Sequence, residues 1–214
     1  MKRITYLFLI AFAIVLGFTS CKSCNKTADN TTPVVSDTTF VVENVISTDK
    51  EYMFTNYNQD YRWYETCIVL KDFLDDENCD GTIEGISNIF QVITEIEKDK
   101  CYDTNVVMIT HTPDTTATDV KHGFWVEDYP LNNEEIKITF KEAYDKVMAT
   151  NSPKPHSKHV VLRKEVGPTT ANVQYIFGNN RAQLYVDAVN GTVSDKNPVF
   201  PEAEGFKMPL GEWP

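Results

Sequence analysis

The chain has 214 residues, of which 42% are hydrophobic and 24% are charged, and its formal net charge is −11. This composition is that of an ordinary globular protein and excludes a fully disordered chain, a collagen and a multi-pass membrane protein. Nucleic acid is not expected as a partner, because phosphate binding requires clustered Lys and Arg.

The first twenty residues predict export. Two basic residues precede the unbroken apolar run Leu7–Leu16, which is too short for a bilayer core of about 30 Å and is typical of a secretory signal. Small residues then lead to Cys21, and this ending resembles a bacterial lipobox, with Phe18 in the place of the usual aliphatic residue. The resemblance implies a signal peptide over 1–20, cleavage before Cys21 and lipidation of Cys21.

A lipidated Cys21 would hold the protein on a membrane through its acyl chains alone, since anionic lipid repels an acidic body. We expect the outer membrane, with the protein facing the periplasm. A transmembrane anchor and a cleaved, secreted form without lipid are the alternatives. Residues 21–39 are polar and have no periodic apolar positions, so they predict a flexible tether.

An α+β unit is expected to follow the tether. Short alternation of apolar and polar residues over 40–57, and aromatic and β-branched residues over 61–74, predict strands. Residues 82–98 place isoleucine and phenylalanine at helical spacing and predict a helix with one apolar face. Two further strands are predicted over 105–112 and 123–126, with a polar loop between them.

A second α+β unit begins with a strongly marked helix. Thr139 and Glu142 form a capping box, and from Phe140 onward apolar residues recur at i, i+3, i+4, i+7 and i+8. Antiparallel strands that outnumber the helices predict the α+β class, with each helix laid on one face of a sheet. Three strands are predicted in this unit, over 159–166, 173–177 and 183–188. The expected organisation is a signal peptide (1–20), a tether (21–39), an N-terminal unit (40–131) and a second unit with a C-terminal tail (132–214).

Two segments of the second unit resemble PepSY-type domains. Residues 138–144 (ITFKEAY) resemble the start of the helix of that family, and residues 185–193 (YVDAVNGTV) resemble its closing strand and turn. The family is associated with exported bacterial proteins, among them protease propeptides. The resemblance implies protein binding or inhibition in the cell envelope and attaches no enzymatic chemistry to the fold.

The closing turn accounts for the one carboxylate in the PepSY-like pattern. Asp187 is expected to bond the backbone of the turn at Asn190 and Gly191, where Gly191 supplies a positive φ. Asp187 is therefore interpreted as a structural residue of the turn. The first unit has a similar inventory of helix and strands, so it is interpreted as a diverged copy, in a tandem that resembles β-lactamase inhibitory protein.

An acidic segment between the predicted strand and helix of the first unit resembles the start of an EF-hand calcium loop. Calcium takes six to eight oxygen ligands, and alternate residues of a tight loop point inward. Ser87 departs from the pattern, since it stands where a bidentate Glu belongs. The alternative interpretation is an acidic turn that caps the following helix. The candidate calcium ligands are Asp76, Asn78, Asp80, Thr82 and Glu84.

Three cysteines fall in the expected folded part, and an exported protein meets an oxidising compartment. Cys79 and Cys101 would flank the predicted helix and stand about 24 Å apart, so a disulfide between Cys67 and Cys101 is preferred.

No motif for a nucleotide site, a serine hydrolase or a zinc peptidase is present in the sequence. We therefore expect a lipid-anchored envelope protein that binds or inhibits another protein, with no catalysis and no cofactor other than possible calcium. An envelope hydrolase with an unrecognised site, and a calcium-stabilised structural or adhesion protein, are the alternatives. The oligomeric state stays open.

Overall fold

The computed structural model describes residues 40–97, 101–125 and 128–200. The predicted signal peptide, Cys21 and the tether lie outside these residues. The helices are α1 (Val42–Tyr57), the 3-10 helix η1 (Asn133–Glu135) and α2 (Phe140–Ala149). The strands are β1 (Tyr61–Leu70), β2 (Ile83–Glu97), β3 (Cys101–Thr112), β4 (Thr115–His122), β5 (His159–Arg163), β6 (Gln174–Asn179), β7 (Ala182–Asp187) and β8 (Val193–Ser194).

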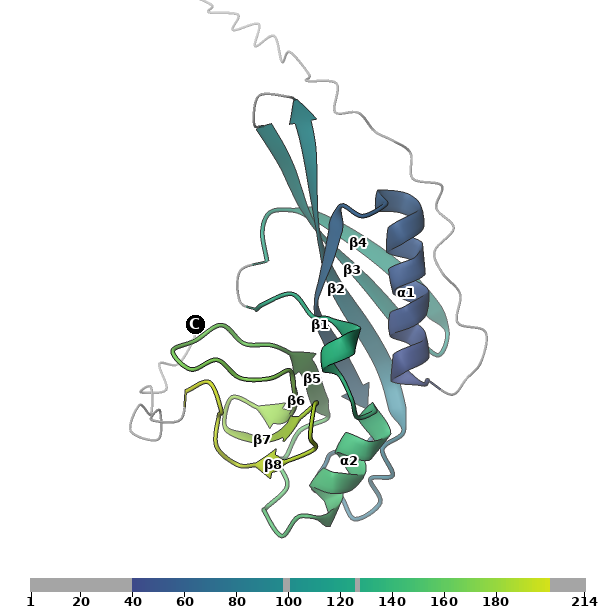
Figure 1. Ribbon diagram of the computed structural model, residues 1–214. Coiled ribbons are helices and arrows are strands. Elements are labelled where there is room, and N and C mark those ends of the chain that lie inside the picture. Colours follow the sequence, from purple (N-terminus) through teal and green to yellow (C-terminus); the bar gives the residue numbers. More distant parts are fainter. Residues whose placement is uncertain (1–39, 98–100, 126–127, 201–214) are drawn as a thin grey trace, which may run out of the picture. The chain divides into compact units, whose positions relative to one another are not determined.

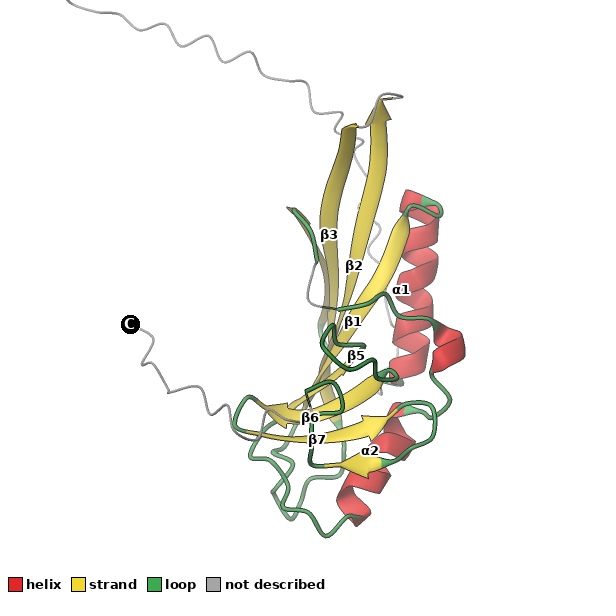
Figure 2. Cartoon of the chain, turned by 60° about the vertical axis from the view of Figure 1, so that its left-hand side comes forward, coloured by secondary structure: helices red, strands yellow, loops and turns green. Residues whose placement is uncertain are grey.

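All eight strands form one sheet in the order β4-β3-β2-β1-β5-β6-β7-β8, and every neighbouring pair is antiparallel. The predicted α+β class is confirmed. Strands β1 and β5 pair at the centre, so the four strands that follow α1 and the four that follow α2 meet there (Figure 1). Both α-helices lie on the same side of the sheet (Figure 2).

One hydrophobic core lies between the helices and the sheet. Val45 of α1 and Val147 of α2 belong to the same buried cluster as Ile68 of β1 and Phe177 of β6. Because successive side chains of a strand point to opposite faces, the residues between these core positions form the other face of the sheet. We call it the open face, since no described helix covers it, although its central residues Glu65, Ile176 and Tyr185 are buried. It includes Glu65, Cys67, Ile89, Val161, Arg163, Ile176 and Tyr185.

Two elements of the first half were predicted wrongly. The expected strands over 40–57 are helix α1, and its buried residues are spaced as on one helical face. The expected helix over 82–98 is strand β2. Its apolar residues lie on both faces of the sheet, with Ile86 and Phe90 in the core and Ile89 on the open face. Taken together, these positions are spaced three and four residues apart, which is also the spacing of one helical face.

The predicted polar loop at 113–122 was wrong as well, because most of it is strand β4. Pro113 and Asp114 form the two-residue turn between Thr112 and Thr115, and the strand is polar because it lies at the edge of the sheet. No strand begins at Gly123.

The second half follows the prediction closely. Helix α2 starts with the expected capping box, in which the Thr139 side chain accepts from the Glu142 backbone and the Glu142 side chain accepts from the Thr139 backbone. Strands β5, β6 and β7 lie within one to three residues of their predicted bounds. Their side chains alternate between the core and the open face, which is the pattern of a half-buried antiparallel sheet.

The preferred disulfide between Cys67 and Cys101 is wrong. Cys67 faces Ser87, Ser87 faces Thr110, and Cys101 lies nine residues farther along β3. At about 3.3 Å per residue, that offset is about 30 Å, which is far beyond the reach of a disulfide. Cys67 and Cys79 are free thiols in the described part of the chain.

Candidate functional site

The centre of the open face carries a group of charged side chains, which we call the Arg163 cluster: Arg163, Glu65, Asp128 and Glu165. Arg163 of β5 faces Glu65 of β1 in the strand register. Asp128, which follows β4 in the sequence, lies beside this pair and forms an isolated antiparallel bridge with Glu165. The Arg163 Nη1 lies 3.8 Å from Glu65 Oε2, its Nε lies 3.8 Å from Asp128 Oδ1, and its Nη2 donates to Glu165 Oε1.

Asp128 is the most unusual member of the cluster. Its side chain is completely buried, and Trp125 Nε1 donates to its Oδ2 over 3.0 Å. Its Oδ1 and the Nε of Arg163 have no hydrogen-bond partner among the described residues. Burial raises the pKa of Asp128 to about 7, although Trp125 and Arg163 oppose the shift, and the neighbouring Glu65 carboxylate raises it further. The cluster thus combines three carboxyl groups with one guanidinium. Two of its buried polar atoms make no hydrogen bond to a described residue.

Cys67 adjoins the cluster as a protonated thiol. Its Sγ donates to Glu65 Oε1 over 2.9 Å. Burial raises the pKa of the Cys67 thiol well above its usual value, and the Glu65 carboxylate adds to the shift. Because the thiolate is the reactive form, this position is unsuited to nucleophilic or redox chemistry.

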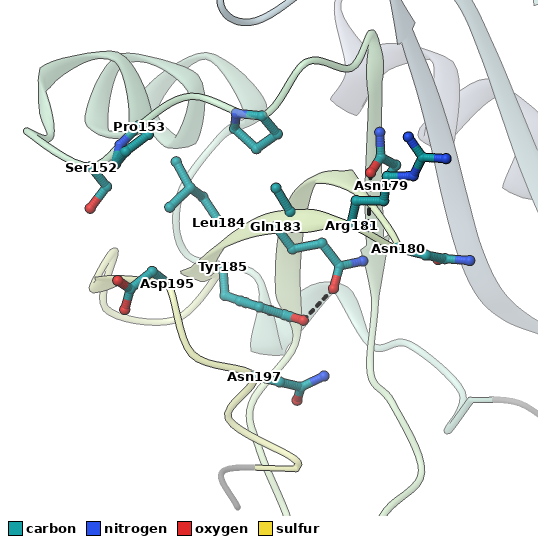
Figure 3. A pocket seen from close by; sticks show the side chains of 12 residues that line it. Ser152, Pro153, Asn179, Asn180, Arg181, Gln183, Leu184, Tyr185, Asp195 and Asn197 are labelled. Atoms are coloured by element: carbon teal, nitrogen blue, oxygen red, sulfur yellow. Dashed lines mark hydrogen bonds between the residues drawn. The ribbon is translucent and has the colours of Figure 1, made fainter. Parts of the chain in front are cut away.

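A polar hollow of about 330 Å³ lies beside the cluster, between the α2–β5 connection, the β6–β7 hairpin and the residues after β8 (Figure 3). Tyr185 and Gln183 point toward one another on its floor and are joined by a hydrogen bond. Burial raises the pKa of Tyr185 to about 12, and the Glu165 carboxylate contributes to the rise. Asn197 links the hollow to the cluster, because its Nδ2 donates to Glu165 Oε2 over 3.1 Å.

A second polar network lies in the core under α1. Asp49 of α1 accepts from Asn88 Nδ2 over 2.7 Å and lies 2.8 Å from His111 Nε2. On its far side His111 Nδ1 lies 3.0 Å from the Thr116 hydroxyl. The order hydroxyl, imidazole, carboxylate resembles a catalytic triad. Asp49, Asn88 and His111 are completely buried, however, so we assign the network to the attachment of α1 to the sheet.

The predicted calcium residues lie in the β1–β2 loop and at the start of β2. Asp76 Oδ1 accepts from the Asn78 backbone over 2.8 Å, and Asp80 Oδ1 accepts from the Thr82 backbone over 2.8 Å. Glu84 is exposed on β2. Because a strand follows the loop, the alternative of a cap on a helix is wrong. Within the described residues, no group of three or more His, Cys, Asp or Glu side chains is arranged to hold a metal.

The loop packs tightly against α2. The hydroxyl of Tyr144 donates to the carbonyl of Cys79 over 2.8 Å. Gly81 has φ of 79°, and a Cβ built on it would lie 2.9 Å from Cε1 of the Tyr144 ring. The glycine is thus required by the backbone conformation and by the ring together.

Asp187 lies at the end of β7 and holds the turn that follows it. Its Oδ1 accepts from the Val189 backbone over 2.8 Å and from the Asn190 backbone over 3.2 Å. Gly191 has φ of 73° and donates to the Asp187 carbonyl over 2.7 Å. Asp187 therefore has the bonds of a turn residue. It lies in the same register row as the Arg163 cluster, because it faces Gln174 of β6 and Gln174 faces Arg163 of β5.

Comparisons of the chain with protein-family models, with curated proteins and with solved structures find no match. Neither α-helix of the described residues is long and apolar enough to span a bilayer.

The Arg163 cluster was not predicted from the sequence. Its members stand between positions 65 and 165 and share no motif. The one available signal was Glu65 in the middle of the segment 61–70, which is rich in aromatic and aliphatic residues and where a buried charge needs a partner.

Proposed function

We propose that this chain is an exported, lipid-anchored envelope protein that binds another protein on the open face of its sheet and performs no catalysis of its own. The observation that supports the proposal most directly is the distribution of the helices. Both cover one face of the sheet, and the opposite face carries the Arg163 cluster at its centre.

The chemistry of the open face favours a protein over a small molecule. Partly exposed apolar side chains such as Val161 and Met108 alternate with polar ones on its strands, and the 330 Å³ hollow at its side is lined mainly by polar residues. Protein interfaces likewise combine apolar and polar side chains, and arginine is among the residues enriched in them. The formal net charge of −11 favours a partner that offers basic side chains.

We also infer that the two halves of the chain are diverged copies of one helix-and-four-strand unit, PepSY-like and arranged in tandem as in proteins resembling β-lactamase inhibitory protein. The support is the repeated order of one helix and four antiparallel strands, together with a strand order that reads outward in both directions from the β1–β5 pair. The absence of motif resemblance in the first half is consistent with divergence.

Site-specific photocrosslinking in cells tests the binding face. A photoreactive residue replaces His159 or Met108, which lie on the open face, and matched controls carry it at Glu51 or Lys141 on the exposed sides of the helices. We expect one and the same protein to be captured from both open-face positions and from neither helix position. Capture that is equal at all four positions, or absent at all four, would reject the proposed face.

A substitution separates binding from folding. His159→Lys adds a positive charge to an exposed position of the open face and is expected to weaken crosslinking from position 108 to a partner that offers basic side chains. Ser47→Lys makes the same change of charge on the exposed side of α1, where it is expected to leave crosslinking unchanged. Turnover of peptide or glycoside substrates by the purified chain would support the hydrolase alternative instead.

A further inference from the structure

Strand β4 forms one edge of the sheet, and no described strand pairs with its outer side. The hydrogen bond from the Gly123 backbone to the Thr104 carbonyl, 2.9 Å long, continues the β3–β4 register. In antiparallel pairs, hydrogen-bonded and non-hydrogen-bonded positions alternate. The odd-numbered residues of β4 therefore direct their N–H and C=O groups toward β3, and Thr116, Thr118 and Val120 direct theirs outward.

We propose that this edge is an interface between two copies of the chain, in which β4 pairs with β4 of a second copy in antiparallel orientation about a two-fold axis at Val120. Val120 has both backbone groups on the outer side, as a hydrogen-bonded pair on the axis requires. Its side chain is 50% exposed in the single chain. The second Val120 would lie directly beside it.

Charge complementarity identifies a second copy as the occupant. With Val120 opposite Val120, Asp119 of each copy faces Lys121 of the other. These are non-hydrogen-bonded positions, where the Cα atoms approach to about 4.5 Å. In the single chain the Lys121 Nζ lies 3.0 Å from Asp119 Oδ2, and both side chains are at least half exposed, so both can turn to the second copy.

Other registers lack this match. An axis at Asp119 or Lys121 also uses the outward backbone groups, since it pairs Thr118 with Val120 or Val120 with position 122, but it would set two Asp119 or two Lys121 side chains opposite each other. An axis at Thr118 keeps the outward groups but sets Asp119 against Ala117, so that neither ion pair forms. The charges thus select a register and a self-partner, while a single pair of strands buries little area. We expect a weak dimer whose formation depends on concentration.

Antiparallel pairing across this axis keeps the open faces of the two copies on the same side of a continuous sheet. Two binding faces would then be presented together, which raises avidity for a repeated or clustered partner. This consequence rests on the proposed function, whereas the dimer itself does not.

Cysteine pairing in the full-length chain tests the register. In the proposed dimer, Val120→Cys sets two thiols across the axis with Cα atoms about 5.5 Å apart, within the range of a disulfide. Thr118→Cys is the matched control, since it also lies on the outward row but faces position 122 of the other copy. We expect mild oxidation to yield covalent dimers of Val120→Cys at least tenfold in excess of those of Thr118→Cys. Equal yields from the two variants, or a disulfide from Val120→Cys to a different protein, would overturn the proposal.

Charge exchange provides a second, independent measurement by light scattering of the same chain. Asp119→Lys and Lys121→Asp each create like-charged pairs and should reduce the dimer fraction severalfold. The double variant restores opposite charges and should recover the wild-type dimer fraction. If the double variant stays as monomeric as the single ones while its melting temperature is unchanged, the ion pairs do not join the two copies and the register is wrong.

Discussion

His111 Nε2 lies 2.8 Å from Asp49 Oδ1, and neither side chain is accessible to solvent. The pair joins Asp49, the only charged residue on the buried side of α1, to strand β3. Asn88 donates a hydrogen bond to the second oxygen of the Asp49 carboxylate. A carboxylate is expensive to bury, so its hydrogen bonds must be complete for the helix to stay in place. The position of α1 on the sheet is therefore specified by polar contacts as well as by apolar packing.

Asp49→Ala is expected to lower the free energy of unfolding by about 2–4 kcal/mol, because it leaves the buried groups of His111 and Asn88 without partners. Urea unfolding followed by tryptophan fluorescence measures the change. Glu51→Ala, on the exposed side of the same helix, is the control and should change stability by less than about 0.5 kcal/mol. Equal effects of the two substitutions would show that the network contributes nothing.

Asp128→Asn is expected to stabilise the protein at pH 8 and to have little effect at pH 5. The folded-state pKa of Asp128, about 7, is above the value near 4 of an unfolded aspartate. Between these values the folded state binds more protons, so stability falls as pH rises from 4 to 7 and the ionised form is disfavoured above that. The asparagine has no proton to lose. Unfolding curves of both proteins at pH 5 and pH 8 provide the measurement, and parallel pH dependences would contradict the assignment.

Gly81→Ala is expected to destabilise the protein by about 1–3 kcal/mol, since its φ of 79° is unfavourable for alanine and the new Cβ would meet the Tyr144 ring. Gly123→Ala is the matched control, because Gly123 also has a positive φ but has no atom within 4 Å of a built Cβ. The difference between the two melting temperatures isolates the contact with Tyr144. It should disappear when Tyr144 is replaced by Ala.

Calcium is expected to raise the melting temperature of the full-length chain relative to chelator if the loop at 76–84 binds it. The double variant Asp76→Asn, Asp80→Asn keeps side-chain oxygens that can accept the bonds from Asn78 and Thr82 but removes two negative charges. It should lose the calcium response and keep its melting temperature in chelator. A wild-type protein that melts at the same temperature in both conditions would reject the calcium prediction.

Local signals in the sequence were sufficient for several elements. Helix α2 was predicted correctly because its capping box and its apolar stripe act within one element, and no other segment competes for Thr139 or Glu142. Strands β6 and β7 were also predicted correctly, because the apolar and polar residues that mark each strand lie within that strand. The α+β class followed from the proportion of strands to helices, which does not depend on the exact assignment of each.

Tertiary structure decided what local signals could not. Helix α1 and strand β2 were exchanged in the prediction, since β2 is apolar on both faces and α1 buries Asp49 where an apolar residue is expected. The Arg163 cluster exists only because the pairing of β1 with β5 sets Glu65 opposite Arg163 and the return of the chain at Asp128 brings a third carboxyl group beside them. The register between β1 and β5 determines which of their side chains meet. These strands are about a hundred residues apart in the sequence, so the residues of either strand alone do not predict the contact.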